Sequence, residues 1–334
     1  MRYRAFGKSG LKVSEIGFGA WGIGGESPGT TSYGPTDDAE SVRALEAAFD
    51  HGITYFDTAG AYGNGHSEDL IGRTFAGRRD RIVIATKAGR RDFREPLDFS
   101  PSAVRASVES SLRRLRTDTI DLLQLHDPDA EAPELDDTFA TLEHLRGQGS
   151  VRLVGVSLRA PADGARVLER FDVDALQVNL NLLDQRALQS CLLDAAAAAG
   201  VAVIARTPLC FGFLTGDYGS ETAFEAADHR NTWPEAQIAR WVQGGRELSA
   251  AVDPRPAQRA VHIALRFCLS FESVATVIPG ILTPAQAREN AAASDFGPLS
   301  KAELTRIRKR YRQNEYLVAP PARVAATILD NAGE

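Results

Sequence analysis

Four ionisable residues stand at, or shortly after, the ends of successive apolar runs: Asp57, Tyr62, Lys87 and His126. A buried carboxylate, ammonium or imidazole is costly unless it has a partner, so convergence of these groups would stabilise them. A tyrosine hydroxyl is a weak acid at its ordinary pKa of about 10, and a neighbouring ammonium lowers that pKa by favouring the phenolate. We therefore expect Lys87 to activate Tyr62, Asp57 to hold Lys87, and His126 to donate to the same substrate oxygen. Such a group would polarise a carbonyl and protonate the alkoxide that develops on it.

Each of these residues also has a purely structural explanation when it is taken alone. Lys–Asp pairs are common in structural ion-pair networks, which perturb titratable groups without catalysis. His126 precedes Asp127 and Pro128 and could simply end a strand. The conjunction of all four residues is what favours a catalytic site.

Eight apolar runs with the character of buried strands must position these residues. The runs are Glu15–Ala20, Ile53–Asp57, Ile82–Thr86, Thr119–Leu125, Val151–Val156, Ala175–Val178, Val201–Ala205 and Ser273–Ile278. Most are apolar throughout, as is typical of parallel strands that are covered on both faces. Their alternation with helical segments predicts an α/β fold, a (β/α)8 TIM barrel, with an open doubly wound sheet as the alternative. In a barrel the carboxyl ends of the strands meet on one face, where the ionisable residues would converge.

The segments around and between these runs carry turn and helix signals. Tyr3–Phe6 and Leu11–Val13 flank a glycine-rich turn and predict an N-terminal β-hairpin. Ser100 can cap a helix that begins at Pro101. A second helix, capped by Asp184, would line up Leu188, Cys191, Leu192 and Ala195 and end before Gly200; a third would line up Val42, Leu45 and Phe49 and end near Gly52.

No linker or low-complexity segment divides the chain, so residues 1–334 are expected to form a single domain. The polar, glycine-containing stretch 212–256 is interpreted as a loop insertion that could hold a helix near Glu235–Val242. Residues 314–334 are assigned to a C-terminal tail.

Composition excludes several classes of protein. The net charge of −6 disfavours a nucleic-acid partner. The three cysteines, Cys191, Cys210 and Cys268, are far apart and form no CxxC motif, which argues against disulfides and a metal site. No run approaches the roughly 18 apolar residues of a membrane span, and no apolar leader follows Met1, so we expect a cytoplasmic protein.

Residues Gly17–Gly22 match the GxGxxG pattern of dinucleotide-binding Rossmann domains. In that fold the third glycine opens a helix whose N-terminus holds the pyrophosphate. Here Gly22 leads into Ile23–Gly29, which is too rich in glycine and proline to form that helix. The pattern is better explained as a strand end that enters a flexible loop.

The order and spacing of the four ionisable residues resemble the catalytic tetrad of the aldo-keto reductase superfamily. Successive separations are 5, 25 and 39 residues. The surrounding motifs agree: Phe56-Asp57-Thr58-Ala59, Thr86-Lys87, Leu125-His126, Gly155-Val156-Ser157, and Ile278-Pro279-Gly280 with Glu289-Asn290. The resemblance covers about residues 3–310. It implies NAD(P)H-dependent reduction of an aldehyde or ketone, a nicotinamide cofactor bound without a Rossmann domain, and Tyr62 as the general acid.

Position by position, the resemblance also implies cofactor contacts. Trp21 would lie near the nicotinamide and the substrate, Ser157 and Gln177 would bind the carboxamide, and Arg206 occupies a position where an aromatic residue usually stacks on the nicotinamide. Further contacts follow the last two strands: Leu209, Gly212, Leu214 and Gly216 around the pyrophosphate, and Gly280, Thr283, Gln286, Glu289 and Asn290 towards the adenosine. Ser157 and Gln177 could instead serve only the barrel, and Arg206 could be paired at its rim. If Arg206 faces the nicotinamide, its charge should disfavour the oxidised cofactor and favour reduction.

The chain departs from the family pattern at two places. Leu158 replaces an asparagine that often follows the serine of Gly-Val-Ser. Pro279–Asn290, which normally carries basic residues for the 2′-phosphate of NADP, holds Arg288 as its sole base. Thr283 and Gln286 also match a helix capping box, and the N-terminus of that helix is an anion site. The expected cofactor is therefore NADP(H), with NAD(H) as a second possibility.

Two other functions remain open at this point. One is an NAD-linked sugar or alcohol dehydrogenase that works in the oxidative direction. The other is a cofactor-binding regulatory protein with weak turnover. The substrate itself and the oligomeric state do not follow from the sequence.

Overall fold

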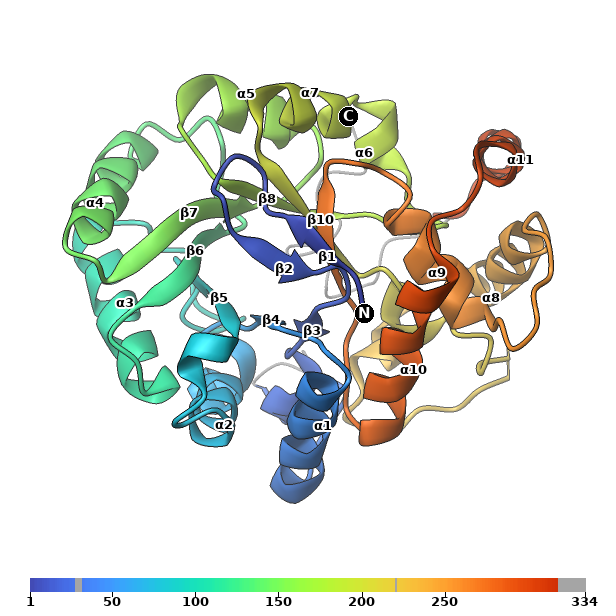
Figure 1. The fold of residues 1–334 in the computed structure, drawn as a ribbon, viewed down its shortest axis with the longest axis horizontal. Helices are drawn as coiled ribbons and strands as arrows, with labels where there is room; N and C mark the ends of the chain where they lie inside the picture. The colour runs from blue at the N-terminus through green and yellow to red at the C-terminus, as the bar shows by residue number, and fades with distance from the viewer. Residues whose placement is uncertain (28–31, 220, 318–334) are drawn as a thin grey trace.

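Eight parallel strands form the centre of the molecule in the computed structural model, which describes residues 1–27, 32–219 and 221–317 (Figure 1). They lie in chain order: β3 (Phe18–Gly19), β4 (Tyr55–Asp57), β5 (Val83–Ala88), β6 (Ile120–His126), β7 (Val151–Ser157), β8 (Ala175–Asn179), β9 (Ala202–Arg206) and β10 (Val274–Ile278). Isolated parallel bridges from Ile16 to Val277 and from Gly19 to Gly280 link the first strand to the last. The eight-stranded sheet is therefore a nearly closed barrel, as predicted.

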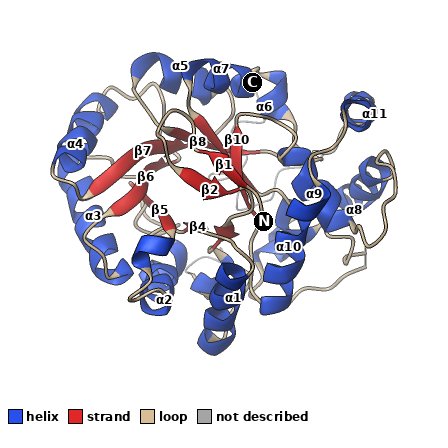
Figure 2. Cartoon of the chain, in the orientation of Figure 1, coloured by secondary structure: helices blue, strands red, loops and turns tan. Residues whose placement is uncertain are grey.

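Helices surround the barrel and connect its strands (Figure 2). They are α1 (Asp38–Asp50), α2 (His66–Thr74), α3 (Pro101–Leu115), α4 (Leu135–Gly147), α5 (Asp163–Arg170), α6 (Arg186–Gln189), α7 (Leu192–Ala199), α8 (Glu235–Ser249), α9 (Ala260–Cys268), α10 (Pro284–Phe296) and α11 (Lys301–Arg312). The apolar faces of these helices pack on the outer faces of the strands and form the main hydrophobic core. Ser100 caps α3 as predicted, because its hydroxyl accepts a hydrogen bond from the Ala103 amide at 3.3 Å.

The predicted N-terminal hairpin is confirmed and closes the amino-terminal end of the barrel. Strand β1 (Tyr3–Ala5) pairs antiparallel with β2 (Lys12–Ser14). Phe6, which follows β1, and Val13 of β2 are fully buried in a second core, together with residues of the barrel strands. Gly7 in the turn has a φ of +54°, and a Cβ there would lie 2.4 Å from the Gly200 carbonyl oxygen, so the turn requires glycine.

A buried carboxylate joins the two ends of the sheet. Glu15 is 1% exposed and accepts hydrogen bonds from the side chains of Arg2 and Arg4, each at 2.9 Å, and from Ser294 in α10 at 2.8 Å. Arg4 also donates to the Val274 carbonyl at the start of β10. These contacts stabilise the seam between the first and last strands of the barrel.

Several element boundaries differ from those predicted. Lys87 lies within β5 and His126 is the last residue of β6, whereas both were expected just after their strands. The predicted strand at Glu15–Ala20 is reduced to β3, because the residues before it pair with their neighbours only through isolated bridges. Gly22–Gly24 forms one turn of 3₁₀ helix where no helix was expected, but this turn belongs to a barrel loop and not to a Rossmann unit.

The helix predicted from Asp184 to Gly200 is wrong as a single element. Cys191 has a φ of 55°, which breaks the segment into α6 and α7. Cys191 and Ala195 are exposed, so they do not share the buried face with Leu192. Apolar spacing alone does not show this left-handed residue.

The predicted insertion 212–256 is more ordered than a loop. It contains the 15-residue helix α8, which extends well beyond the helix expected near Glu235–Val242. Trp241 of α8 packs against the rings of Phe213 and Trp233. Residues 314–317 of the predicted tail are described, whereas 318–334 lie outside the described residues.

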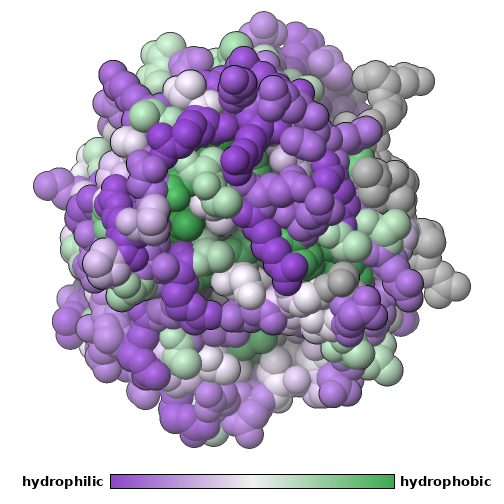
Figure 3. All heavy atoms as spheres, turned by 90° about the vertical axis from the view of Figure 1, so that its right-hand side faces the viewer, coloured by the Kyte–Doolittle hydropathy of each residue, from purple (hydrophilic) through white to green (hydrophobic). Residues whose placement is uncertain are grey.

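The face over α8 to α11 is largely hydrophilic, with small groups of apolar residues between the polar ones (Figure 3). Among the helices that the structure describes, none is both long enough and apolar enough to cross a membrane.

Candidate active site

The four ionisable residues expected at the carboxyl end of the barrel do come together. The Lys87 ammonium donates to Asp57 Oδ1 at 2.5 Å, to the Thr58 carbonyl at 2.8 Å and to Tyr62 Oη at 3.2 Å. The His126 ring lies beside that of Tyr62, with ring centres 6.1 Å apart and the ring planes nearly perpendicular. A single ammonium therefore connects a buried carboxylate to the tyrosine hydroxyl.

Asp57 is held by two glutamine amides in addition to Lys87. Gln177 Nε2 donates to Asp57 Oδ2 at 2.7 Å, and Gln124 Nε2 donates to the same oxygen at 3.1 Å. Sequence analysis missed Gln124. A signal was present, because Gln124 is a polar residue in an apolar strand, two positions before His126 and hence on the same face of β6.

The electrostatics of Tyr62 and Lys87 modify the expected activation. Burial raises the pKa of Tyr62 above its ordinary value, while the Lys87 ammonium opposes this change. Burial lowers the pKa of Lys87, but the Asp57 carboxylate and Tyr62 outweigh burial and raise it. Lys87 therefore lowers the pKa of Tyr62 as predicted, although burial has the larger effect and the net change is upward. Lys87 itself remains charged beside the hydroxyl.

His126 is a buried, neutral imidazole. Burial, together with the charges of Lys87, Arg90 and Arg206, holds the pKa of His126 well below its usual range. Its ring also packs edge-on against Phe93, whose ring is nearly parallel to that of Tyr62. A neutral imidazole at this place can donate a hydrogen bond to a substrate oxygen without adding charge.

A cavity of about 350 Å³ opens onto these residues. Its lining includes Asp57, Tyr62 and His126, and it continues along the residues after β9 to the first turns of α10. A Cβ at Gly280 would meet open space, so no described side chain fills this part of the cavity. An elongated ligand that reaches from Tyr62 to α10 fits this shape.

Comparison with known proteins identifies the family. The model of the Aldo/keto reductase family matches residues 15–312. Aldo-keto reductase YhdN of Bacillus subtilis is 32% identical over 294 residues, which is 86% of this chain and 86% of that protein. The chain belongs to the aldo/keto reductase family.

Other relatives of this aldo-keto reductase agree. L-galactose dehydrogenase of Arabidopsis thaliana is 32% identical over 301 residues, which is 87% of each protein. The holo form of an aldo-keto reductase from Bacillus halodurans has a TM-score of 0.78 and 28% identity, over 95% of this chain and 98% of that one. The protein is thus an oxidoreductase of carbonyls and alcohols, and its family uses nicotinamide cofactors.

Most residues expected to contact the cofactor line the cavity of this aldo-keto reductase. They are Trp21, Gln177, Arg206, Leu209, Gly212, Gly280, Gln286, Glu289 and Asn290. Four others do not: Ser157, Leu214, Gly216 and Thr283. Ser157 is fully buried, and Leu214 is part of the hydrophobic core at 2% exposure. Lys87 is likewise absent from the lining, although its partners Asp57 and Tyr62 belong to it.

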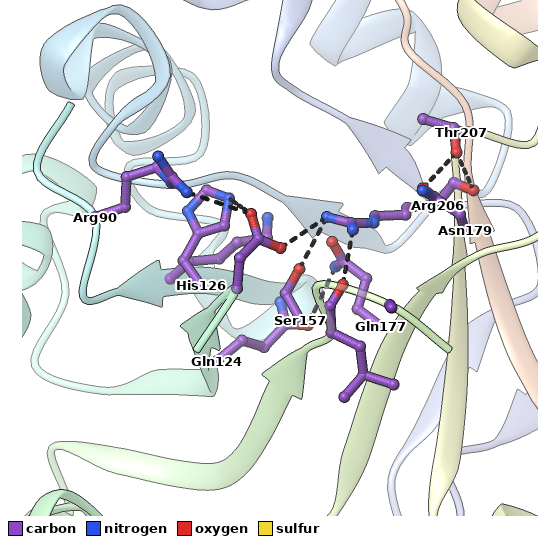
Figure 4. Close-up of polar contacts among 12 residues, drawn as sticks. Arg90, Gln124, His126, Ser157, Gln177, Asn179, Arg206 and Thr207 are labelled. Atoms are coloured by element: carbon purple, nitrogen blue, oxygen red, sulfur yellow. Dashed lines mark hydrogen bonds and ion pairs between the residues drawn. The ribbon is translucent and has the colours of Figure 1, made fainter. Parts of the chain in front are cut away.

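Arg206 lies in the cavity wall of the aldo-keto reductase but is already paired (Figure 4). Its guanidinium donates to Asp127 Oδ1 at 3.2 Å, to Ser157 Oγ at 3.2 Å and to the Leu158 carbonyl at 2.8 Å. Asp127 therefore offsets the Arg206 charge that was expected to disfavour an oxidised nicotinamide. The Ser157 hydroxyl, which was expected to bind the carboxamide, contacts Arg206 instead.

The α10 end of the cavity differs from the simple capping box predicted. Thr283 accepts a hydrogen bond from the Gln286 amide as expected, but the Gln286 side chain accepts from the Leu282 amide at 2.7 Å. Glu289 pairs with Arg259, and Arg259 also pairs with Asp217 at 2.5 Å. Sequence analysis did not predict this base, because Arg259 comes from the start of another helix.

A second buried histidine, His229, makes the stability of this aldo-keto reductase depend on pH. Its ring packs against Trp21, Tyr33 and Phe211, and burial lowers its pKa to about 4. Because the folded-state pKa lies below the unfolded value of about 6.5, the unfolded chain binds the proton first as the pH falls. Stability is therefore complete above pH 6.5, and about 3 kcal/mol is lost from this group as the pH falls to 4.

We expect His229→Phe, measured by denaturant unfolding at pH 7 and pH 4.5, to reduce this loss of stability. His126 has the same sign of shift, so part of the pH dependence remains. His51→Gln, at an exposed position, is the matched control. Equal pH dependence in wild type and His229→Phe would contradict the assignment.

Proposed function

We propose that this aldo-keto reductase reduces an aldehyde or ketone to an alcohol with NAD(P)H, and that Tyr62 is the general acid. The observation that carries the proposal is the contact of the Lys87 ammonium with both Asp57 and Tyr62 Oη, at the wall of the cavity. A charged ammonium beside the hydroxyl stabilises the phenolate that remains after proton transfer.

The roles of the residues follow from their positions. The substrate carbonyl oxygen accepts hydrogen bonds from Tyr62 and from neutral His126, which polarise it. A bound, reduced nicotinamide would supply the hydride for the carbonyl carbon. The proton passes from Tyr62 Oη to the alkoxide oxygen, and Lys87, itself balanced by Asp57, stabilises the resulting phenolate.

The cofactor would lie along the cavity from Tyr62 to α10. Gln177 and Arg206 line the nicotinamide end, and Gln286, Glu289 and Asn290 line the adenosine end. Because Leu282 and the Arg259–Glu289 pair stand where basic residues for a 2′-phosphate are usual, we propose that both NADP(H) and NAD(H) bind. Losing charge-assisted contacts of roughly 1.5–3 kcal/mol each would reduce NADP selectivity by about tenfold or more.

Oxidation of a sugar or other alcohol is the second candidate. The Asp127 carboxylate next to Arg206 favours it, since its negative charge reduces the repulsion between Arg206 and a positively charged, oxidised nicotinamide. Relatives named L-galactose dehydrogenase and D-threo-aldose 1-dehydrogenase are 32% and 30% identical to the chain.

The test is a panel of aldehydes, ketones and sugars, assayed in both directions with each cofactor, together with fluorescence titration of cofactor binding. We expect turnover of at least one aldehyde with NAD(P)H and less than a thousandfold preference for NADPH. Cofactor binding without turnover of any compound would instead indicate a regulatory protein. Turnover of alcohols alone would support the dehydrogenase.

A further inference from the structure

Arg90 is a buried guanidinium without a hydrogen bond among the described residues. It follows β5 and Gly89, at the base of a loop that is closed by the hydrogen bond from the Asp98 amide to the Gly89 carbonyl, at 2.9 Å. Arg90 is 9% exposed, and its Nε has no partner in the part of the chain that the structure describes. Its ion pair is with Asp127, at 3.6 Å, which is too long for a hydrogen bond.

The local charges compensate Arg90 only in part. Asp127 is shared, and its other oxygen is closer to Arg206, at 3.2 Å, than the first oxygen is to Arg90. In Figure 4, Arg90 and Arg206 lie on opposite sides of His126, and each of them pairs with the Asp127 carboxylate. Lys87 and Asp57 balance one another, and burial keeps His126 neutral. Two guanidinium groups therefore share one carboxylate, which leaves one positive charge.

This charge lies next to the catalytic cavity. Phe93, His126 and Asp127 line the cavity there, and Arg90, which is not itself in the lining, contacts Phe93 and Asp127. The Arg90 guanidinium carbon is 5.5 Å from the centre of the Phe93 ring, and that ring is 6.5 Å from the ring of Tyr62. A substrate whose carbonyl contacts Tyr62 could thus place a second group at the edge of Phe93.

The chemistry of Arg90 specifies what that second group would be. A buried charge without hydrogen bonds costs free energy that an anion can recover. The planar fork of the guanidinium matches the two oxygens of a carboxylate or the oxygens of a phosphate. We propose that Arg90 binds a carboxylate or phosphate group of the carbonyl substrate, so that this aldo-keto reductase prefers anionic aldehydes or ketones. The proposal rests on the proposed carbonyl reduction.

The test compares anionic substrates with neutral partners of similar size. The pairs are succinic semialdehyde with butanal for the carboxylate, and glyceraldehyde 3-phosphate with glyceraldehyde for the phosphate. The readout is the ratio of kcat/KM for the anionic compound to kcat/KM for its neutral partner, in wild type, Arg90→Gln, Arg90→Lys and Arg91→Gln. Arg91 is the matched control, because it is the next residue in the same loop and its side chain is 81% exposed.

We expect wild type to prefer at least one anionic compound, and Arg90→Gln to reduce that ratio by about 10- to 100-fold, mainly through KM. Arg90→Lys should recover part of the ratio, and Arg91→Gln should leave it unchanged. The pair that responds identifies carboxylate or phosphate. Wild-type preference for both neutral compounds, or equal losses on both members of a pair in Arg90→Gln, would overturn the proposal.

A binding measurement separates this proposal from the proposed function. Calorimetric titration of the cofactor-loaded protein with 4-hydroxybutyrate, and separately with glycerol 3-phosphate, needs no turnover. Binding of either compound by wild type that weakens in Arg90→Gln supports the anion site even if no aldehyde is reduced. Turnover of neutral aldehydes without binding of either anion supports the reductase and rejects the anion site.

Discussion

Replacing Tyr62 by phenylalanine is expected to lower kcat for carbonyl reduction by about 10²- to 10⁴-fold. The substitution removes the hydroxyl that contacts Lys87 at 3.2 Å and keeps the ring that packs against Phe93 and His126. Because the change removes only the hydroxyl and leaves the ring of Tyr62 in the cavity wall, cofactor affinity should stay nearly the same. Steady-state kinetics with a substrate found in the panel, together with fluorescence titration of the cofactor, measures both effects.

Tyr55→Phe is the matched control for this experiment. Tyr55 is fully buried on the same strand as Asp57, and its hydroxyl has no hydrogen-bond partner among the described residues. Its removal should therefore preserve activity and folding. Wild-type kcat in Tyr62→Phe, or equal losses in both variants, would show that the assigned acid is wrong.

Replacing Lys87 by methionine should reduce both activity and stability. The Tyr62 phenolate loses its stabilising charge, so kcat should fall by about 10²-fold or more. The Asp57 carboxylate also loses its buried partner, which typically costs about 3–5 kcal/mol. The Gln124 and Gln177 amides still donate to Asp57, so we expect the loss of unfolding free energy to lie at the lower end of this range.

The double variant Asp57→Asn/Lys87→Met separates the two effects. Removing both charges should restore much of the unfolding free energy, because no uncompensated ion remains in the barrel. Activity should not return, since the ammonium beside Tyr62 is still absent. Recovery of kcat in the double variant would mean that Lys87 serves only to balance Asp57.

The barrel and the convergence of the ionisable residues could be predicted because both follow from short-range patterns. Apolar runs that alternate with helical segments fix the strand order, and a residue at the end of a parallel strand must lie on the face where the other strands end. This places Asp57, Tyr62, Lys87 and His126 together without any knowledge of their contacts.

Contacts across the barrel could not be predicted in this way. The amide of Gln177 reaches Asp57 four strands away, and the partner of Glu289 is Arg259 from another helix. The break at Cys191 depends on one left-handed residue, which apolar spacing does not report. Arg90 comes shortly after the predicted strand Ile82–Thr86, but its contacts with Phe93 and Asp127 form only when the chain folds.

The contacts of Glu15 between the first and last barrel strands have a consequence for folding during synthesis. The first barrel strand is joined on one side to β4 and on the other only to residues near β10, more than 250 positions later in the chain. During synthesis from the N-terminus, β3 therefore has one open edge until the last strand has emerged. Glu15, Arg2 and Arg4 are close in sequence, so their ion pairs can form before the last strand has emerged. When β10 is added, it then meets these charged side chains rather than an apolar strand edge.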